Sequence, residues 1–235
     1  MNVSRNLARI GLVSAFVAMT ATIQAATSEQ NFKFVSRLEQ DLLGRTPNRS
    51  EAKVYPSALS WGATRAQVVG LITASNEYRS EQIQDYFSEF LNAAARPSTV
   101  TFYLDLLQQG ATSDDIKAAI LGSDDYYQFA GGTAPAFLGK LFEDVLGRPI
   151  DRLSASAFEN MLNQGTSRQT VAGMILHSLE ADQREVSLLF EKYLHRAPQA
   201  GELANYAQLL QSGAAEELII GVLCGSDEYF QMAIA

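Results

Sequence analysis

The strongest constraint on the fold of this 235-residue chain is a pattern that recurs four times. In each copy a glycine is followed thirteen residues later by a serine. The pairs are Gly62 and Ser75, Gly110 and Ser123, Gly165 and Ser178, and Gly213 and Ser226. Self-similarity at a period of roughly 50 residues is typical of repeat architectures, so we predict four related units.

Apolar residues predict three helices in each unit. In the first unit, Phe34, Leu38 and Leu42 share one helical stripe before the recurring glycine, and Val68 and Ile72 share another after it. Strand-like alternation of apolar and polar residues does not compete with these stripes. The predicted fold is therefore all-α, an array of four related three-helix units.

A middle helix is predicted from an aromatic residue seven positions before each glycine and a leucine three positions before it. The aromatic residues are Tyr55, Tyr103, Phe158 and Tyr206, and the leucines are Leu59, Leu107, Leu162 and Leu210. Residues four apart lie on one helix face, so we expect each pair to enter the core.

An arginine and an acidic residue also recur in every unit. The arginines are Arg45, Arg96, Arg148 and Arg196, and the acids, two residues after each serine, are Glu77, Asp125, Glu180 and Glu228. A guanidinium group can donate two hydrogen bonds to one carboxylate. We predict a structural clamp between the arginine and the acid of each unit.

The stretch GGTAP at residues 131–135 is the glycine- and proline-rich segment most typical of a hinge. It divides the chain into two predicted pairs of units, at residues 28–130 and 131–235. Both one continuous solenoid and two separate lobes are consistent with this division.

The N-terminus predicts export. Arg5 and Arg9 precede an apolar run at residues 10–23 and then Ala25, the order found in a cleavable signal peptide spanning residues 1–25. The run is shorter than the roughly 20 residues that cross a bilayer. We therefore expect a periplasmic or extracellular protein without stable membrane insertion.

Net charge limits the classes of partner, and cysteine content limits the disulfides that can form. The formal net charge is −8, which disfavours binding to nucleic acid. Cys224 is the single cysteine, so no disulfide can form within the chain, and its apolar surroundings predict a buried thiol.

No catalytic motif, cofactor motif or metal motif is found in the sequence. The chain has two histidines, His177 and His195, and no H-E-x-x-H, G-x-S-x-G or G-x-G-x-x-G pattern. The stretches SDDYY at 123–127 and SDEYF at 226–230 lack the spacing of an EF-hand loop and are typical of helix starts. We expect no enzyme, no cofactor and no metal, although paired carboxylates for glycoside hydrolysis stay open because only their geometry would reveal them.

Several of these stretches resemble a known family. LLGRTPN at 42–48, VLGRPID at 145–151, the G-[AT]-[TS]-R stretches and S-x-E-Y resemble the bacterial domain of unknown function 4214. The pattern is also remotely similar to the helical linker domain of phycobilisomes. The first resemblance implies an exported or surface-associated domain, and the second implies a helical domain that holds other proteins together and catalyses nothing.

These observations favour an exported, non-catalytic scaffold or interaction protein of the bacterial envelope or the extracellular space. Its expected partner is a protein or a polysaccharide. Two alternatives stay open: a carbohydrate-binding or carbohydrate-cleaving protein, and a self-assembling surface-layer component that forms homo-oligomers.

Overall fold

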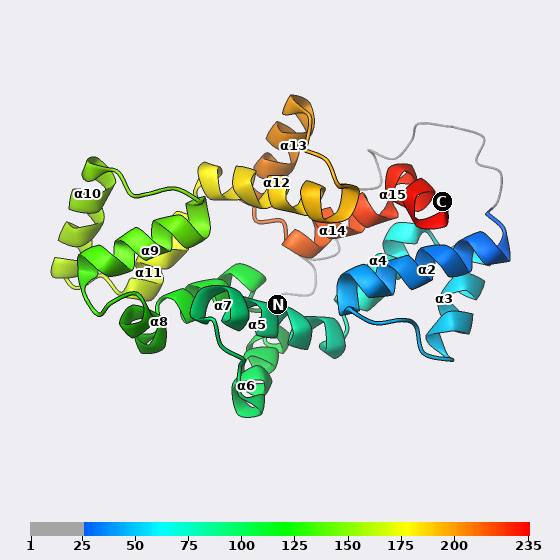
Figure 1. The fold of residues 1–235 in the computed structure, drawn as a ribbon, viewed down its shortest axis with the longest axis horizontal. Coiled ribbons are helices and arrows are strands. Elements are labelled where there is room, and N and C mark those ends of the chain that lie inside the picture. The colour runs from blue at the N-terminus through cyan, green and yellow to red at the C-terminus, as the bar shows by residue number, and fades with distance from the viewer. Residues whose placement is uncertain (1–25) are drawn as a thin grey trace.

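A computed structural model describes residues 26–235 (Figure 1). They form fourteen α-helices and no strand, which confirms the all-α prediction for this part of the chain. The predicted signal peptide lies outside the described residues. Within residues 26–235, no helix has both the length and the apolar character needed to span a bilayer.

The helices follow one another through short connections. They are α2 (Ser28–Leu43), α3 (Glu51–Ser60), α4 (Arg65–Thr73), α5 (Asn76–Leu91), α6 (Pro97–Gln108), α7 (Ser113–Leu121), α8 (Asp124–Phe129), α9 (Ala134–Leu146), α10 (Arg152–Asn163), α11 (Arg168–Leu176), α12 (Leu179–Leu194), α13 (Ala200–Gln211), α14 (Glu216–Gly225) and α15 (Asp227–Ile234).

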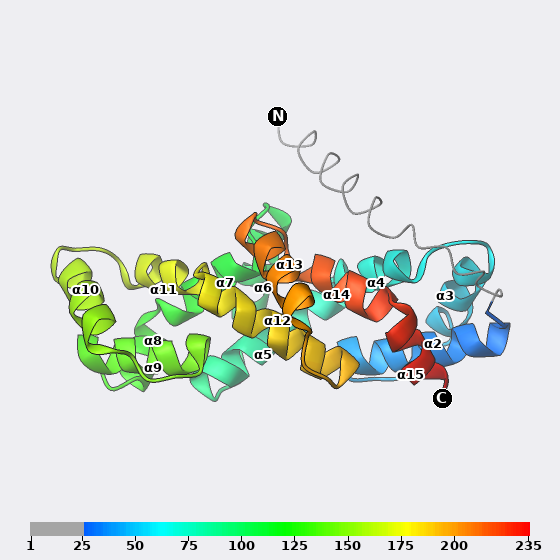
Figure 2. The same cartoon turned by 90° about the horizontal axis from the view of Figure 1, so that it is seen from above.

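The molecule is elongated. Helices α2, α3, α4 and α15 lie at one end and α9, α10 and α11 at the other, while α5 and α12 run through the middle (Figures 1 and 2). Helices α6 and α13 project outward near the centre. The C-terminal helix α15 lies beside α2, although the two are at opposite ends of the chain.

The recurring serines begin helices. Each accepts a hydrogen bond from the backbone N–H three residues later, at 3.1 or 3.2 Å. Each such bond satisfies one of the free donors of a helix start. The serines therefore mark the starts of α5, α8, α12 and α15.

The recurring glycines follow the middle helices in a left-handed conformation. Their φ angles are 102° for Gly62, 100° for Gly110, 92° for Gly165 and 83° for Gly213. A side chain is strained at such angles, which explains why glycine stands at all four places. The hydroxyl groups of Thr64, Thr112 and Ser167 then cap the next helix.

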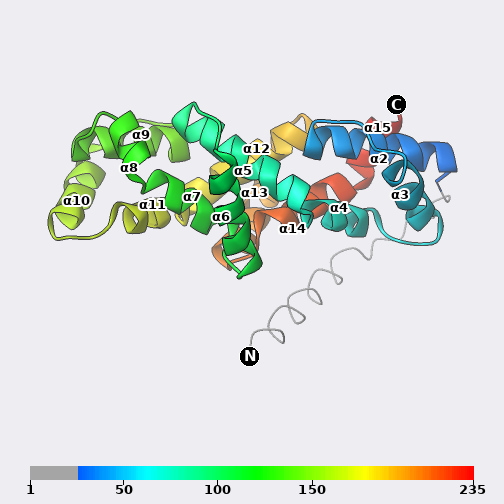
Figure 3. The ribbon, with the colours of Figure 1, turned by 90° about the horizontal axis from the view of Figure 1, so that it is seen from below.

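Apolar side chains form two buried clusters. Cluster one is built mainly from α2, α4, α12, α14 and α15, and it contains Phe34, Leu38 and Ile219. Cluster two is built mainly from α5, α7, α8, α9 and α11, and it contains Phe137 and Leu141. In each cluster, two helices that follow a recurring glycine pack against each other. These helices are α4 and α14 in cluster one, and α7 and α11 in cluster two (Figure 3).

Packing therefore joins helices differently from their order in the chain. Cluster one combines helices from the first and the last predicted units, and cluster two combines the second and the third. The division of the chain into residues 28–130 and 131–235 stays a prediction. Each cluster combines helices from both of these segments.

The aromatic residues of the middle helices reach the clusters to different extents. Tyr103 is buried, whereas Tyr55, Phe158 and Tyr206 are half-buried and pack against the cluster edges. The four leucines at their spacing are likewise half-buried against the clusters. The middle helices thus cover the clusters from outside.

Candidate functional site

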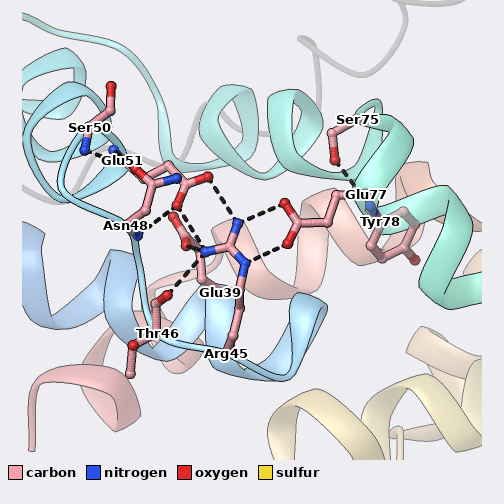
Figure 4. A network of polar contacts seen from close by, with 9 residues as sticks. All are labelled: Glu39, Arg45, Thr46, Asn48, Ser50, Glu51, Ser75, Glu77 and Tyr78. Carbon is pink, nitrogen blue, oxygen red and sulfur yellow. Dashed lines mark hydrogen bonds and ion pairs between the residues drawn. The ribbon is translucent and has the colours of Figure 1, made fainter.

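The densest polar network surrounds Arg45, just after α2 (Figure 4). Its guanidinium donates to Glu77 over 2.5 and 2.7 Å, to Glu51 over 2.9 and 3.0 Å, and to Glu39 over 2.9 Å. It also donates to the carbonyl of Thr46. One arginine therefore joins α2, α3 and α5 through three carboxylates.

Two further arginines form the predicted pair. Arg148 donates to both oxygens of Glu180 over 2.5 and 2.8 Å, and Arg196 to both oxygens of Glu228 over 2.6 and 2.9 Å. Arg196 also donates to both oxygens of Glu202, at 2.8 and 2.9 Å. Three of the four predicted pairs thus come together, each across 32 residues of chain.

The fourth predicted pair does not come together. Among the described residues, Arg96 forms no ion pair, and Asp125 lies in the first turn of α8. Helix α6 begins at Pro97, immediately after Arg96, which occupies the N-cap position. Arg45, Arg148 and Arg196 each stand directly after the left-handed residue that ends a helix, whereas Ala93 occupies that place after α5 and Arg96 lies three residues further on.

The network shifts the acidity of its carboxyl groups. Hydrogen bonds from Arg45 hold the pKa of Glu77 below its ordinary value, and those from Arg148 and Arg196 do the same for Glu180 and Glu202. Burial, followed by the nearby charge of Glu51, raises the pKa of Glu39 to about 7. One oxygen of Glu39 is buried without a hydrogen-bond partner.

A second arginine network was missed by the clamp prediction. Arg65 donates to the carbonyl of Gly225 at 3.1 Å, pairs with Asp227 and lies 4.5 Å from the ring centre of Phe230. It belongs to the stretch GATR at 62–65. This arginine ties the start of α4 to the start of α15.

Arg168 makes the same contacts in cluster two. It donates to the carbonyl of Gly122 at 3.3 Å, pairs with Asp124 and lies 4.4 Å from the ring centre of Tyr127. The sequence signal was the arginine of the G-[AT]-[TS]-R stretches, which is present in the first and third predicted units. Those stretches gave no indication of the partner acid.

The first acid of SDDYY and the first acid of SDEYF are thus paired with arginines. Asp124 and Asp227 each pair with an arginine of another helix. Within residues 26–235, no three His, Cys, Asp or Glu side chains are grouped to hold a metal ion.

The two histidines lie at helix ends, and the single cysteine lies in the core. His195 ends α12 in a left-handed conformation, and its Nε2 lies 3.0 Å from a guanidinium nitrogen of Arg37. His177 follows α11 and faces Asp114 across 3.6 Å. Cys224 is buried in cluster one, and burial raises the pKa of its thiol.

A cavity of about 470 Å³ lies between α5 and α12, where the two clusters meet. Helices α7 and α14 contribute Lys117 and Glu216 to its wall. Lys117 is buried, and its Nζ lies 3.0 Å from Glu216, 3.7 Å from Asp114 and 3.8 Å from Glu185. Titratable groups therefore concentrate at the junction of the two clusters.

Comparison with known proteins places the N-terminal part in a family. The family model described as domain of unknown function (DUF4214) matches residues 14–82, a span that includes Arg45, Gly62, Ser75 and Glu77. No curated protein and no solved structure matches the chain. The chain therefore carries a DUF4214 domain at residues 14–82, and the resemblance is confirmed for that part.

Proposed function

We propose that this protein is an exported, non-catalytic helical repeat protein that serves as a scaffold or interaction module at the bacterial envelope or outside the cell. One observation carries the proposal: three of the four recurring arginines bond to the recurring acid of their own predicted unit. Arg45, Arg148 and Arg196 each hold an acid at the start of another helix. Recurring residues that served catalysis would instead leave their polar groups free for a substrate.

The proposed units form two equivalent pairs, first with fourth and second with third. Residue numbers in the two sets of contacts differ by 103: Arg65 and Asp227 in one correspond to Arg168 and Asp124 in the other. Phe34 and Tyr229 likewise correspond to Phe137 and Tyr126, with ring centres 6.0 Å apart in both pairs. Stacked units of this kind present long side surfaces to partners.

Apolar side chains at both ends of the molecule support a binding role. Trp61, directly after α3, is 87% exposed, and Leu153 in α10 is 83% exposed. Helices α3 and α10 lie at opposite ends (Figure 1). Exposed aromatic and aliphatic side chains such as these can anchor a protein or polysaccharide partner. The formal charge of −8 opposes a nucleic-acid partner.

The two ends offer matched variants for a test. We expect immobilised wild-type protein to retain a specific protein or polysaccharide from envelope or culture-supernatant fractions. Either Trp61→Ser or Leu153→Ser should lower the retained amount at least about tenfold, while the other variant leaves it unchanged. Both substitutions lie on the surface, so both variants should keep the wild-type unfolding midpoint.

Three results would count against this function. Equal retention by both variants and by an unrelated acidic protein would indicate nonspecific adsorption. Cleavage of a polysaccharide by the purified protein would favour the carbohydrate-cleaving alternative. Recovery of the protein alone, with concentration-dependent oligomers in ultracentrifugation, would favour the self-assembling alternative.

The four recurring aromatic residues of the middle helices do not support the carbohydrate alternative. Sugar-binding clefts present exposed aromatic faces, whereas Tyr103 is buried and Tyr55, Phe158 and Tyr206 pack against the clusters.

A further inference from the structure

The cavity between the two clusters has an excess of negative charge. Its wall includes Glu89 from α5, Asp114 and Lys117 from α7, Glu185 from α12 and Glu216 from α14. The ammonium group of Lys117 faces three carboxylates within 3.8 Å, the nearest of them Glu216. One positive charge cannot balance three negative charges in a partly buried site.

A buried hydroxyl group in the same wall has no partner. Tyr86 lines the cavity, its side chain is 7% exposed, and its hydroxyl forms no hydrogen bond. Lys117 Nζ lies 5.3 Å from the centre of the Tyr86 ring, over its face. A buried polar group without a partner costs about 1–3 kcal/mol, so this hydroxyl favours a ligand that forms a hydrogen bond with it.

We propose that the cavity binds a small organic cation with two or more ammonium groups, a polyamine in chemical class. Its ammonium groups would pair with Glu185 and Asp114, and one N–H would donate to the hydroxyl of Tyr86. A volume of about 470 Å³ is within the range of sites for small molecules. The three carboxylates would repel an anion, and among the described residues no three carboxylates are grouped to hold a metal ion.

The acidity of Glu185 agrees with this ligand. Burial raises the pKa of its carboxyl group to about 7 despite the nearby lysine. The charged groups facing it are Glu89 from α5, Asp114 and Lys117 from α7, and Glu216 from α14. A cation beside Glu185 would favour its ionised form, so we expect affinity to rise by up to about tenfold from pH 6 to pH 8.

The test is titration calorimetry of the purified protein with spermidine in 150 mM salt. We expect saturable binding of one spermidine per chain. Glu185→Gln should weaken binding at least about tenfold because it removes the charge partner. Tyr86→Phe should weaken it about fivefold, the loss of one hydrogen bond, while raising the unfolding midpoint of the ligand-free protein, because it removes a buried hydroxyl that has no partner.

Glu191→Gln is the matched control. Glu191 lies on the same helix as Glu185 and is exposed outside the cavity wall. Its replacement by glutamine removes the same charge as Glu185→Gln. Its substitution should change affinity less than twofold. Equal weakening by Glu191→Gln and Glu185→Gln, full displacement of spermidine by an equal concentration of Mg²⁺, or no saturable binding up to 1 mM would each overturn the proposal.

Discussion

Arg45 has more carboxylate partners than the corresponding arginines because the residue six positions before it differs. Phe90, Phe142 and Phe190 stand six positions before the other three arginines, whereas Glu39 stands before Arg45. The guanidinium groups of Arg148 and Arg196 lie over the rings of Phe142 and Phe190, 5.3 and 5.0 Å from the ring centres. Six residues before Arg45, the buried carboxylate of Glu39 stands in place of the phenylalanine ring.

Replacing Arg45 should destabilise the protein strongly. In Arg45→Gln, the carboxylates of Glu39, Glu51 and Glu77 lose their shared cation, and Glu39 is fully buried. We expect a loss of about 2–3 kcal/mol in the free energy of unfolding, measured by urea denaturation at pH 7.5. Arg96→Gln is the control, with an expected change below about 0.5 kcal/mol. Equal losses in the two variants would contradict a special role for the Arg45 network.

Glu39 should make stability depend on pH. Its folded-state pKa of about 7 lies above the ordinary value of 4.5, so the folded protein binds more protons than the unfolded chain between these values. The contribution of this group to stability is therefore complete below about pH 4.5 and is lost as the pH rises towards 7.

Glu39→Gln should remove this dependence. The amide can accept from Arg45 and donate to Glu51 without carrying a charge. We expect an unfolding midpoint at pH 7.5 equal to or above that of the wild type and a flatter profile between pH 5 and 7.5, measured by thermal denaturation. Glu191→Gln should keep the wild-type profile, and an unchanged profile in Glu39→Gln would show that another group titrates.

At the scale of helices, glycines allow two pairs to approach closely. A Cβ atom on Gly225, at the end of α14, would lie 2.9 Å from the backbone nitrogen of Ala66 in α4. A Cβ on Gly122, at the end of α7, would lie 2.5 Å from the Cα of Gln169 in α11. Arg65 and Arg168 donate to the carbonyls of these same glycines. The arginine of one helix can therefore reach the glycine carbonyl at the end of the other because the two helices lie this close together.

Helix α14 contains both a restricted and an unrestricted glycine. Gly225→Ala should cost about 2 kcal/mol because the methyl group would push α4 away. Gly221→Ala should be neutral or stabilising by up to about 1 kcal/mol, because a Cβ there has no neighbour within 4 Å and alanine favours the helix. Unfolding in urea measures both. Similar effects of the two substitutions would show that α4 and α14 separate at little cost.

At the scale of the molecule, the termini complete cluster one without a covalent link. The hydroxyl of Tyr229 in α15 donates to Asp41 in α2 at 2.9 Å, as Tyr126 in α8 donates to Asp144 in α9 at 2.8 Å. Helices α8 and α9 are joined by a short connection, whereas α15 and α2 are at opposite ends of the chain. Packing and hydrogen bonds therefore hold α15 and α2 in the arrangement that a short loop supports for α8 and α9.

This equivalence predicts that a circular permutant folds. The Nζ of Lys33 donates to the carbonyl of Ile234 at 3.3 Å, so a linker of about eight residues can join Ala235 to Thr27. Opening the chain between Gly131 and Gly132 should leave helix content unchanged and lower stability by less than about 1 kcal/mol, measured by circular dichroism and urea denaturation.

A second permutant with the same linker, opened inside α12 between Phe190 and Glu191, provides the control. It divides a helix that contributes Leu189 and Phe190 to cluster one, so it should lose most of its stability. Failure of the first permutant together with folding of the second would contradict the equivalence of the two pairs.

The sequence by itself determined the helices, their ends and the polar residues that recur at them. Serine caps and apolar stripes act within a few residues of chain, so the helix starts at SDDYY and SDEYF could be assigned correctly without a fold. The tertiary structure decided which stripes meet: α4 packs on α14, Arg65 pairs with Asp227, and charges gather around Lys117. Burial of apolar surface has no direction along the chain, so many pairings of similar helices satisfy one sequence pattern until their shapes and charges are brought together.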